Sequence, residues 1–179
     1  MGRHRDDPGG TAGALASAAR IIEKVAALAD PTHVPSCSIN PVISCGSVMM
    51  SWQAELLGFP NPVLGLAGFP VVAASGAAIL ARGYLRRWYR LAGSLAGVGL
   101  VHWLIFQSLY RIGALCPYCM AVWVCAVVTL TAVSALLATR GTLPAFLARY
   151  APTILVAWLA VVATLSAIRF RDHWATLLF

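Results

Sequence analysis

Charged side chains are missing from four long stretches of this chain. No Asp, Glu, Lys or Arg occurs in 56–81, 91–110, 112–139 or 150–168. Only 11% of the 179 residues are charged, whereas 60% are hydrophobic and the mean hydropathy is +0.79. A helix of about 20 apolar residues crosses the hydrocarbon core of a bilayer. The scarcity of charge therefore excludes an ordinary soluble domain and predicts four membrane spans.

A fifth stretch, 11–30, is long enough to cross a membrane but contains charges. Arg20, Glu23 and Lys24 lie within it, and each is costly to leave in lipid. We expect this stretch to be the first of five spans. The predicted spans are 11–30, 62–81, 91–110, 117–138 and 151–168.

Acidic residues are also few, with six Asp and Glu against thirteen Lys and Arg, which gives a formal net charge of +7. Such an excess can mark a nucleic-acid-binding surface, but here the arginines gather between the spans. Outside the first span, which contains Arg20, they cluster in the N-terminal tail, in 82–90 and in 140–149; Arg111, Arg169 and Arg171 are the exceptions. Because cytoplasmic loops are enriched in Lys and Arg, the three clusters are predicted to face the cytoplasm. The positive charge is thus interpreted as a sign of topology.

This topology assigns a side of the cell membrane to each connecting segment. The N-terminal tail, 1–10, is predicted to be cytoplasmic, and the loop 31–60 lies on the outer side. The turn around Arg111 and the C-terminal tail, 169–179, are outside as well. We therefore expect a multi-pass protein of the plasma or inner membrane.

Cysteine is scarce, with five residues, but four of them fall on the outer side. Cys37 and Cys45 lie in the outer loop, and Cys116 and Cys119 form a Cys-x-x-Cys pair where the fourth span begins. Disulfides persist in an oxidising compartment outside the cytoplasm. Cys125 lies deeper in the span and is expected to be a small buried hydrophobic residue.

The Cys-x-x-Cys pair in "LCPYCMAVWVC" (115–125) marks the start of a helix. Cys116 can be the N-cap, and Pro117 fits the first helical position. Unpaired N–H groups and the helix dipole stabilise a thiolate there, so we expect a lowered thiol pKa and a reactive pair. Cys119 lies about 4.5 Å deeper than Cys116. Cys116 can then meet a protein thiol, and Cys119 a lipid-soluble oxidant.

Two other interpretations of the four cysteines stay open on these grounds. They can form a structural zinc site, although Cys37 and Cys45 are separated by seven residues including Pro41, unlike the short spacing usual for zinc. They can also be static disulfides in a non-enzymatic membrane scaffold or transporter subunit. A bridge across three residues of one helix, however, closes almost no loop and stabilises little.

The sequence "GSVMMSWQAELLG" after Cys45 predicts a short amphipathic helix on the outer surface of the bundle. Apolar residues recur at helical spacing, namely Val48, Met49, Trp52 and Leu56. The segment is too short to span a membrane, and Gly58 can end the helix. The alternative is that it begins the next span, which Pro60 and Pro62 disfavour.

Two polar residues near the spans have alternative interpretations. Asn61 can cap the second span or donate a hydrogen bond to a ligand carbonyl, and local sequence favours the cap. His102, inside the third span, can border a pocket, but a packed interhelical histidine is the favoured interpretation.

The string from Cys37, "CSINPVISCGSVMMSWQAELLGFPNPVLGLAGFP", followed by "CPYC", resembles the vitamin K epoxide reductase family in its bacterial form. The similarity runs from about residue 20 to 138. It implies an all-α integral membrane protein with a four-helix transmembrane bundle around a quinone pocket. A fifth transmembrane helix and a short horizontal helix on the outer face complete the fold. The transmembrane domain then covers 11–168.

The resemblance also implies roles for single residues. Cys37 is expected to exchange with the partner, and Cys45 to attack Cys116. Cys119 is expected to pass the electrons to the quinone, and Asn61 to donate a hydrogen bond to a quinone carbonyl in place of a cap. Further quinone-binding residues implied by the resemblance are Ser51, Met49 and Trp123, the last where many family members have a tyrosine.

The function that the resemblance implies is that of a membrane thiol oxidoreductase. It oxidises an exported thioredoxin-fold protein and reduces a quinone of the menaquinone or vitamin K type, without a metal, in support of disulfide formation in secreted proteins. Many bacterial members carry a fused thioredoxin-fold domain. This chain stops at Phe179, so a separate partner protein is expected. The first span departs from the family, because it is rich in Ala, Gly and Ser.

Overall fold

The computed structural model describes residues 8–30, 32–81 and 85–173, and the statements below refer to them. Five helices are long: α1 (Pro8–Ala29), α3 (Pro62–Leu80), α4 (Arg87–Gln107), α5 (Pro117–Thr139) and α6 (Phe146–Arg169). Three elements are short: α2 (Cys45–Met49), the 3-10 helix η1 (Trp52–Glu55) and η2 (Ser108–Ile112), a π-helical turn that continues α4. Within the described ranges the chain is helical, without a named strand.

Four of the described helices are long and apolar enough to cross a membrane, namely α3, α4 with η2, α5 and α6. An all-α multi-pass membrane protein is therefore confirmed. The helix α1 has 22 residues and is about 33 Å long. It carries the three charges Arg20, Glu23 and Lys24 and is not one of these four, so its place as a span stays a prediction.

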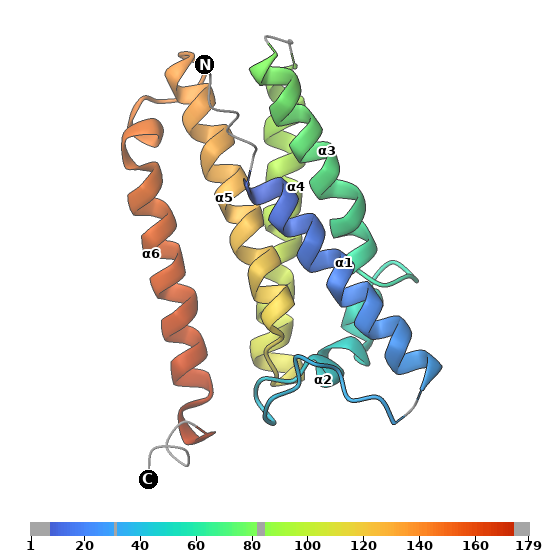
Figure 1. Cartoon of the computed structure of the whole chain (residues 1–179). Coiled ribbons are helices and arrows are strands. Elements are labelled where there is room, and N and C mark those ends of the chain that lie inside the picture. Colours follow the sequence, from blue (N-terminus) through green and yellow to red (C-terminus); the bar gives the residue numbers. More distant parts are fainter. Residues whose placement is uncertain (1–7, 31, 82–84, 174–179) are drawn as a thin grey trace.

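The helix α5 lies at the centre of the packing. It contacts α1, α4 and α6, while α1 also packs along α3 (Figure 1). The helices α3 and α4 form no comparably extensive contact with each other. The bundle of α1, α3, α4 and α5 is thus less tightly closed between α3 and α4 than elsewhere.

Small residues let α1 and α3 approach closely. Gly13 lies so near the ring of Phe69 that a side chain at this position would overlap with it. In the same interface Gly65 of α3 leaves space for Ser17 of α1. The Ala-, Gly- and Ser-rich composition of α1 therefore serves close helix packing, as in many membrane proteins.

The helix α6 is attached to α4 by a histidine. Trp158 Nε1 donates a hydrogen bond to His102 Nε2 at 2.9 Å. Because that nitrogen must accept, the other ring nitrogen, Nδ1, carries the proton and donates to the carbonyl of Val98 at 2.8 Å. His102 is thus the interhelical residue that the sequence favoured.

The predicted amphipathic helix is interrupted, which corrects the sequence-based expectation. Ser51 adopts an extended conformation between α2 and η1, and its hydroxyl donates to the Val48 carbonyl at 2.8 Å. This bond takes up a carbonyl at the end of α2 and turns the chain. Met49 is buried, whereas Trp52 is 67% exposed and meets Trp103 edge-on at a centroid distance of 6.5 Å.

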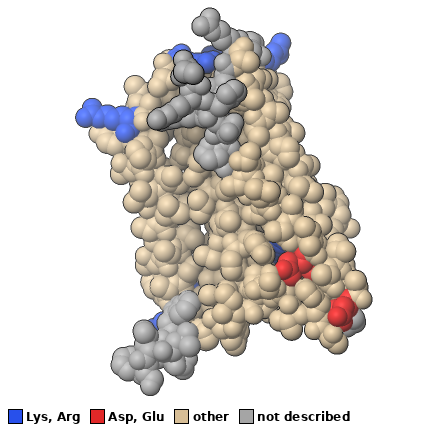
Figure 2. Space-filling model, in the orientation of Figure 1, with Lys and Arg blue, Asp and Glu red and all other residues tan. Residues whose placement is uncertain are grey.

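Charge is distributed unevenly between the two ends of the molecule. Figure 2 shows most of the visible Lys and Arg at the end where α5 passes into α6, and Asp and Glu toward the other end. Arg86, Arg87, Arg140 and Arg149 are exposed and belong to the first of these ends. The tail residues Arg3 and Arg5 and the loop residue Arg82, also used to predict topology, lie outside the described residues.

The close approach of α1 and α3 generates a stability prediction. Gly13→Val should lower the free energy of unfolding by about 1–3 kcal/mol, because its side chain must displace the Phe69 ring. Gly99→Val in α4 is the matched control, since nothing lies within 4 Å of a side chain added there. Thermal unfolding of both purified variants in detergent measures the difference. Equal melting temperatures for the two would contradict the packing described here.

Candidate active site

Two backbone hydrogen bonds join the outer loop to the segment before α5. Leu115 N donates to the Val42 carbonyl at 2.7 Å, and Ser44 N donates to the Leu115 carbonyl at 3.0 Å. They form an isolated parallel bridge between Ile43 and Leu115. Cys116 directly follows Leu115, and Cys45 lies two residues after Ile43, so the bridge sets the distance between their sulfur atoms.

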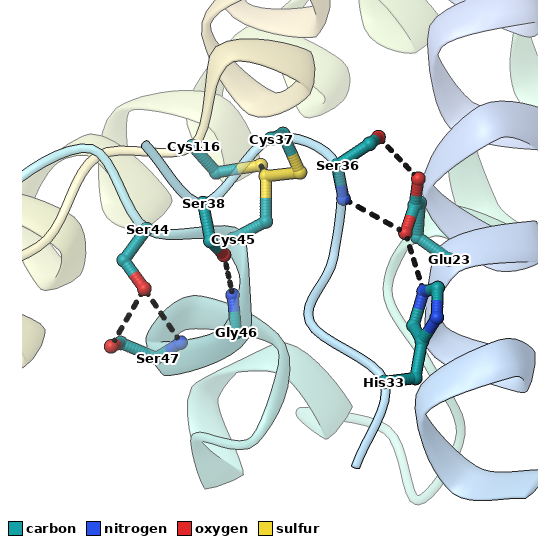
Figure 3. Close-up of a disulfide and its surroundings, with 10 residues drawn as sticks. All are labelled: Glu23, His33, Ser36, Cys37, Ser38, Ser44, Cys45, Gly46, Ser47 and Cys116. Carbon is teal, nitrogen blue, oxygen red and sulfur yellow. Dashed lines mark hydrogen bonds and ion pairs between the residues drawn. A yellow bond between two sulfur atoms is a disulfide. The ribbon is translucent and has the colours of Figure 1, made fainter. Parts of the chain in front are cut away.

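The bridge brings three sulfur atoms together. Cys37 and Cys45 form a disulfide with a Cα–Cα distance of 5.6 Å, and Cys116 lies beside it (Figure 3). The Sγ atoms of Cys45 and Cys116 are 3.0 Å apart, although 71 positions separate them in sequence. Both of these cysteines are 0% exposed, whereas Cys37 is 7% exposed. Cys116 is therefore placed for thiol–disulfide exchange with Cys45.

The loop between the two bonded cysteines is shaped by short polar side chains. Asn40 Oδ1 accepts hydrogen bonds from the backbone N–H groups of Val42 at 3.0 Å and Ile43 at 2.6 Å. This is an Asx-type turn, for which asparagine is well suited. Ser44 then caps α2, because its hydroxyl accepts from the N–H of Ser47 at 3.3 Å (Figure 3).

Two charges of α1 hold this loop against the bundle. The Glu23 carboxylate accepts hydrogen bonds from the hydroxyl and the N–H of Ser36, and it contacts His33 Nε2 at 3.1 Å (Figure 3). Lys24 pairs with the carboxylate of Glu55 and donates to the carbonyl of Met49 at 3.3 Å. Both charges are thereby satisfied by the outer loop.

The N-terminal position of Cys116 on α5 predicted a lowered thiol pKa, and this expectation was wrong. Burial raises the pKa of the Cys116 thiol, because removal from water disfavours the thiolate. The positive charge of Arg20 and the N–H of Tyr118 lower the pKa, but to a smaller extent. Packing around Cys116 thus outweighs the effect of the helix N-terminus.

A cavity of about 920 Å³ lies among α1, α3, α4 and α5 below the sulfur atoms. Its lining along α5 begins at Cys119 and ends at Leu136, a distance of about 25 Å along the helix axis. Most of the lining is apolar, with contributions from facing residues of α3 and α4. A long apolar cavity that ends at a cysteine suits a lipid-soluble molecule.

Three of the four predicted quinone-binding residues line this cavity, namely Ser51, Asn61 and Trp123. Trp123 is buried one turn after Cys119. Met49 does not line the cavity; its side chain is buried instead in the cluster that contains Cys37, Cys45 and Cys116. Cys125 is buried, as its sequence context predicted.

Asn61 connects η1 to the start of α3. Its Nδ2 donates to the Gln53 carbonyl at 2.6 Å, and its Oδ1 accepts from Leu56 N at 3.2 Å. It occupies the N-cap position but makes no side-chain cap bond. Local sequence alone therefore misassigned it as a cap. Gln53 takes one of the two amide N–H groups, and the other is available at the cavity wall.

Sequence analysis missed several polar residues of the cavity wall, and two of them lie on α1. Ser17 and Arg20, three positions apart on α1, line the cavity, and Ser17 Oγ and Arg20 Nε are buried without a hydrogen-bond partner among the described residues. Arg20 stood out only as a charge inside a predicted span. The sequence feature that could have revealed this pair is the three-residue spacing of Ser17 and Arg20, which places both side chains on one face of a helix.

The alternative of a structural zinc site required all four cysteines, but the structure brings only three of their sulfur atoms together. The sulfur atoms of Cys37, Cys45 and Cys116 lie within 4.8 Å of one another, close enough to share an ion. Cys119 is not in this group, and two of the three sulfurs are joined in a disulfide. Zinc binds thiolates rather than disulfide sulfurs, so the group as described fits redox exchange better than metal binding.

Apolar spanning helices, a loop disulfide in contact with a buried thiol, and an apolar cavity under a second thiol define a membrane thiol–disulfide oxidoreductase. The model of the vitamin K epoxide reductase family matches residues 9–135 of the 179, and the chain belongs to this family. In general the family consists of quinone-linked redox enzymes. The comparison with curated proteins gives no match.

The raised pKa of Cys116 can be tested by alkylation. In a chain in which Cys37, Cys45, Cys119 and Cys125 are all replaced by Ser, Cys116 is the thiol left to react and has no disulfide to exchange with. Its rate of alkylation by iodoacetamide should rise with pH through a midpoint above the ordinary thiol value of about 8.5, because only the thiolate reacts. The same chain unfolded in denaturant is the control. A folded midpoint below the unfolded one would show that the helix N-terminus prevails after all.

Proposed function

We propose that this protein oxidises the dithiol of an exported thioredoxin-fold partner and passes the electrons to a quinone of the menaquinone or vitamin K type. The observation that supports the proposal most directly is the 3.0 Å separation of Cys45 Sγ and Cys116 Sγ. It connects a loop disulfide to the Cys-x-x-Cys pair at the end of an apolar cavity. Disulfide formation in secreted proteins is the process that an oxidised partner would support.

The first two steps are thiol–disulfide exchanges. The partner dithiol reduces the disulfide between Cys37 and Cys45, which yields a partner disulfide and two loop thiols. The loop dithiol then reduces a disulfide between Cys116 and Cys119 through a mixed disulfide of Cys45 and Cys116. The described structure corresponds to the state after this transfer, with the loop disulfide formed and without a bond between Cys116 and Cys119.

The last step oxidises the Cys-x-x-Cys pair. Cys116 and Cys119 give up two electrons and form their disulfide, and the quinone takes up these electrons and two protons to become a hydroquinone. The cavity fits this acceptor, because Cys119 and Asn61 lie in its wall and its length of about 25 Å accommodates an apolar tail. The loose contact between α3 and α4 provides a way in from the lipid.

The raised pKa of Cys116 favours this direction of transfer. A thiolate at Cys116 would attack Cys45 and return the electrons to the loop, since the two sulfurs are in contact. Burial keeps Cys116 protonated, and a thiol is a poor nucleophile. The electrons therefore remain on the Cys-x-x-Cys pair until an acceptor reaches Cys119.

The partner is proposed to approach the Cys37 side of the loop from the outer face of the cell membrane. Cys37 is the more accessible loop cysteine, and exposed apolar side chains, Val34 and Ile39, flank it. The exposed Arg140 and Arg149, where α5 passes into α6, lie at the opposite end of the bundle, and Arg111, Arg169 and Arg171 are the exceptions at the loop end. This asymmetry supports a cytoplasmic tail at 1–10, an outer redox loop at 31–60 and an outer C-terminal tail at 169–179.

Replacement of Cys119 tests the path of the electrons. Cys119→Ser should abolish reduction of menadione by the dithiothreitol-reduced protein. In the same variant isolated with its loop disulfide, the Cys116 thiol should exchange with that disulfide, so that a Cys45–Cys116 bond accumulates and Cys37 is released as a thiol, because Cys119 is no longer there to attack Cys116. Peptide mapping by mass spectrometry detects this bond. Cys125→Ser, on the same helix, is the control and should retain the native rate.

A native rate of menadione reduction in Cys119→Ser would contradict the proposed function. Zinc bound in stoichiometric amount to the purified chain, with thiols that menadione does not reoxidise, would support the structural metal site instead. Thiols that stay in fixed disulfides throughout would support the scaffold.

A further inference from the structure

Two polar side chains of α1 face the cavity without a partner in the described part of the chain. Ser17 is 1% exposed and Arg20 is 7% exposed. The hydroxyl of Ser17 and Nε of Arg20 make no hydrogen bond, and both residues belong to the cavity wall. Buried polar groups are nearly always bonded, so each exception calls for an explanation.

The contrast with the neighbouring charges of α1 is informative. Glu23 is bonded to Ser36, and Lys24 is paired with Glu55. Within the described residues, no ion pair joins Arg20 to a carboxylate. A buried cation without a counter-charge is costly, and a guanidinium kept at that cost inside a membrane protein indicates a ligand.

The chemistry of the cavity indicates which ligand group Arg20 binds. A guanidinium donates hydrogen bonds and accepts none, so its partner is an oxygen or an anion. In the proposed reaction the quinone ring takes up electrons at this end of the cavity, because Cys119 lies in the same wall as Arg20. A quinone ring carries two carbonyl oxygens, and Asn61 offers a donor to only one of them.

We propose that Arg20, assisted by Ser17, forms an oxygen-binding subsite that holds the quinone carbonyl not bound by Asn61. This inference rests on the proposed function and extends it. When one thiolate and one thiol of the Cys-x-x-Cys pair become a disulfide, the ring takes up two electrons and the thiol proton and bears one negative charge. Arg20 faces that charge on sulfur before the transfer and on oxygen after it. A second proton from the outer aqueous side completes the hydroquinone.

Arg20 should therefore contribute more to the reaction than to the fold. An interaction that strengthens as charge moves onto the ligand acts on kcat rather than on KM alone. Removal of the charge should also relieve the burial cost in the empty protein. Loss of activity without loss of stability is the expected signature, and a merely structural arginine would show the reverse.

The experiment compares Arg20→Gln, Arg20→Lys and Ser17→Ala in the purified full-length chain, with menadione as the probe. Arg20→Gln should lower kcat/KM roughly ten- to hundredfold, as expected for a lost hydrogen bond to a charged group. Its melting temperature without menadione should equal or exceed the native value. Menadione binding should raise the melting temperature of the native chain, and this increase should be absent in Arg20→Gln. Arg20→Lys keeps the charge and should recover part of kcat.

Arg149→Gln is the matched control, because it removes the same charge from an exposed position on α6 outside the cavity. It should leave both readouts unchanged. A kcat/KM within about twofold of native in Arg20→Gln, or an Arg20→Gln chain that is less stable in proportion to its lost activity, would overturn the subsite. If Arg20→Gln fails to fold, the other two variants decide. The subsite is then overturned if menadione raises the melting temperature of Ser17→Ala as much as that of the native chain and Arg20→Lys keeps the native kcat. A native chain that does not reduce menadione refutes the proposed function instead.

Discussion

The backbone bridge between Ile43 and Leu115 is the constraint on which the active site depends. Two hydrogen bonds fix the outer loop to the residue before Cys116, and thereby fix the contact between Cys116 and Cys45. Side chains support the bridge from both sides. Asn40 accepts hydrogen bonds from the N–H groups of Val42 and Ile43, and Glu23 and Lys24 of α1 bind the loop before and after the bridge. Because backbone bonds set the position of the sulfurs, the arrangement does not depend on the disulfide alone.

The elements that sequence could predict are those set by local composition. Charge-free runs predict α3, α4, α5 and α6 as membrane-crossing helices, and Pro117 marks where α5 begins. The break between α2 and η1 was not predicted, because apolar spacing is continuous across it. The break falls at Ser51, whose backbone is extended and whose hydroxyl bonds to the Val48 carbonyl.

Tertiary packing decides the parts of the site that the sequence could not show. The pKa of Cys116 depends on burial that arises only when the loop covers it. Met49 has the spacing of a cavity residue but turns toward the cysteines. Glu23 and Lys24 find their partners in the outer loop, as far as 31 positions away, so their presence in an apolar helix looked unfavourable from sequence alone.

The complete burial of Cys45 and Cys116 also insulates the relay. The two middle sulfurs are out of contact with water, so in the proposed relay a soluble reductant meets Cys37 first and a membrane oxidant meets Cys119 first. A leak between the aqueous thiol pool and the membrane pool would require direct access to the middle of the path. In the proposed relay, each exchange is therefore confined to its own end of the protein, and the Cys-x-x-Cys pair stores the electrons between the two encounters.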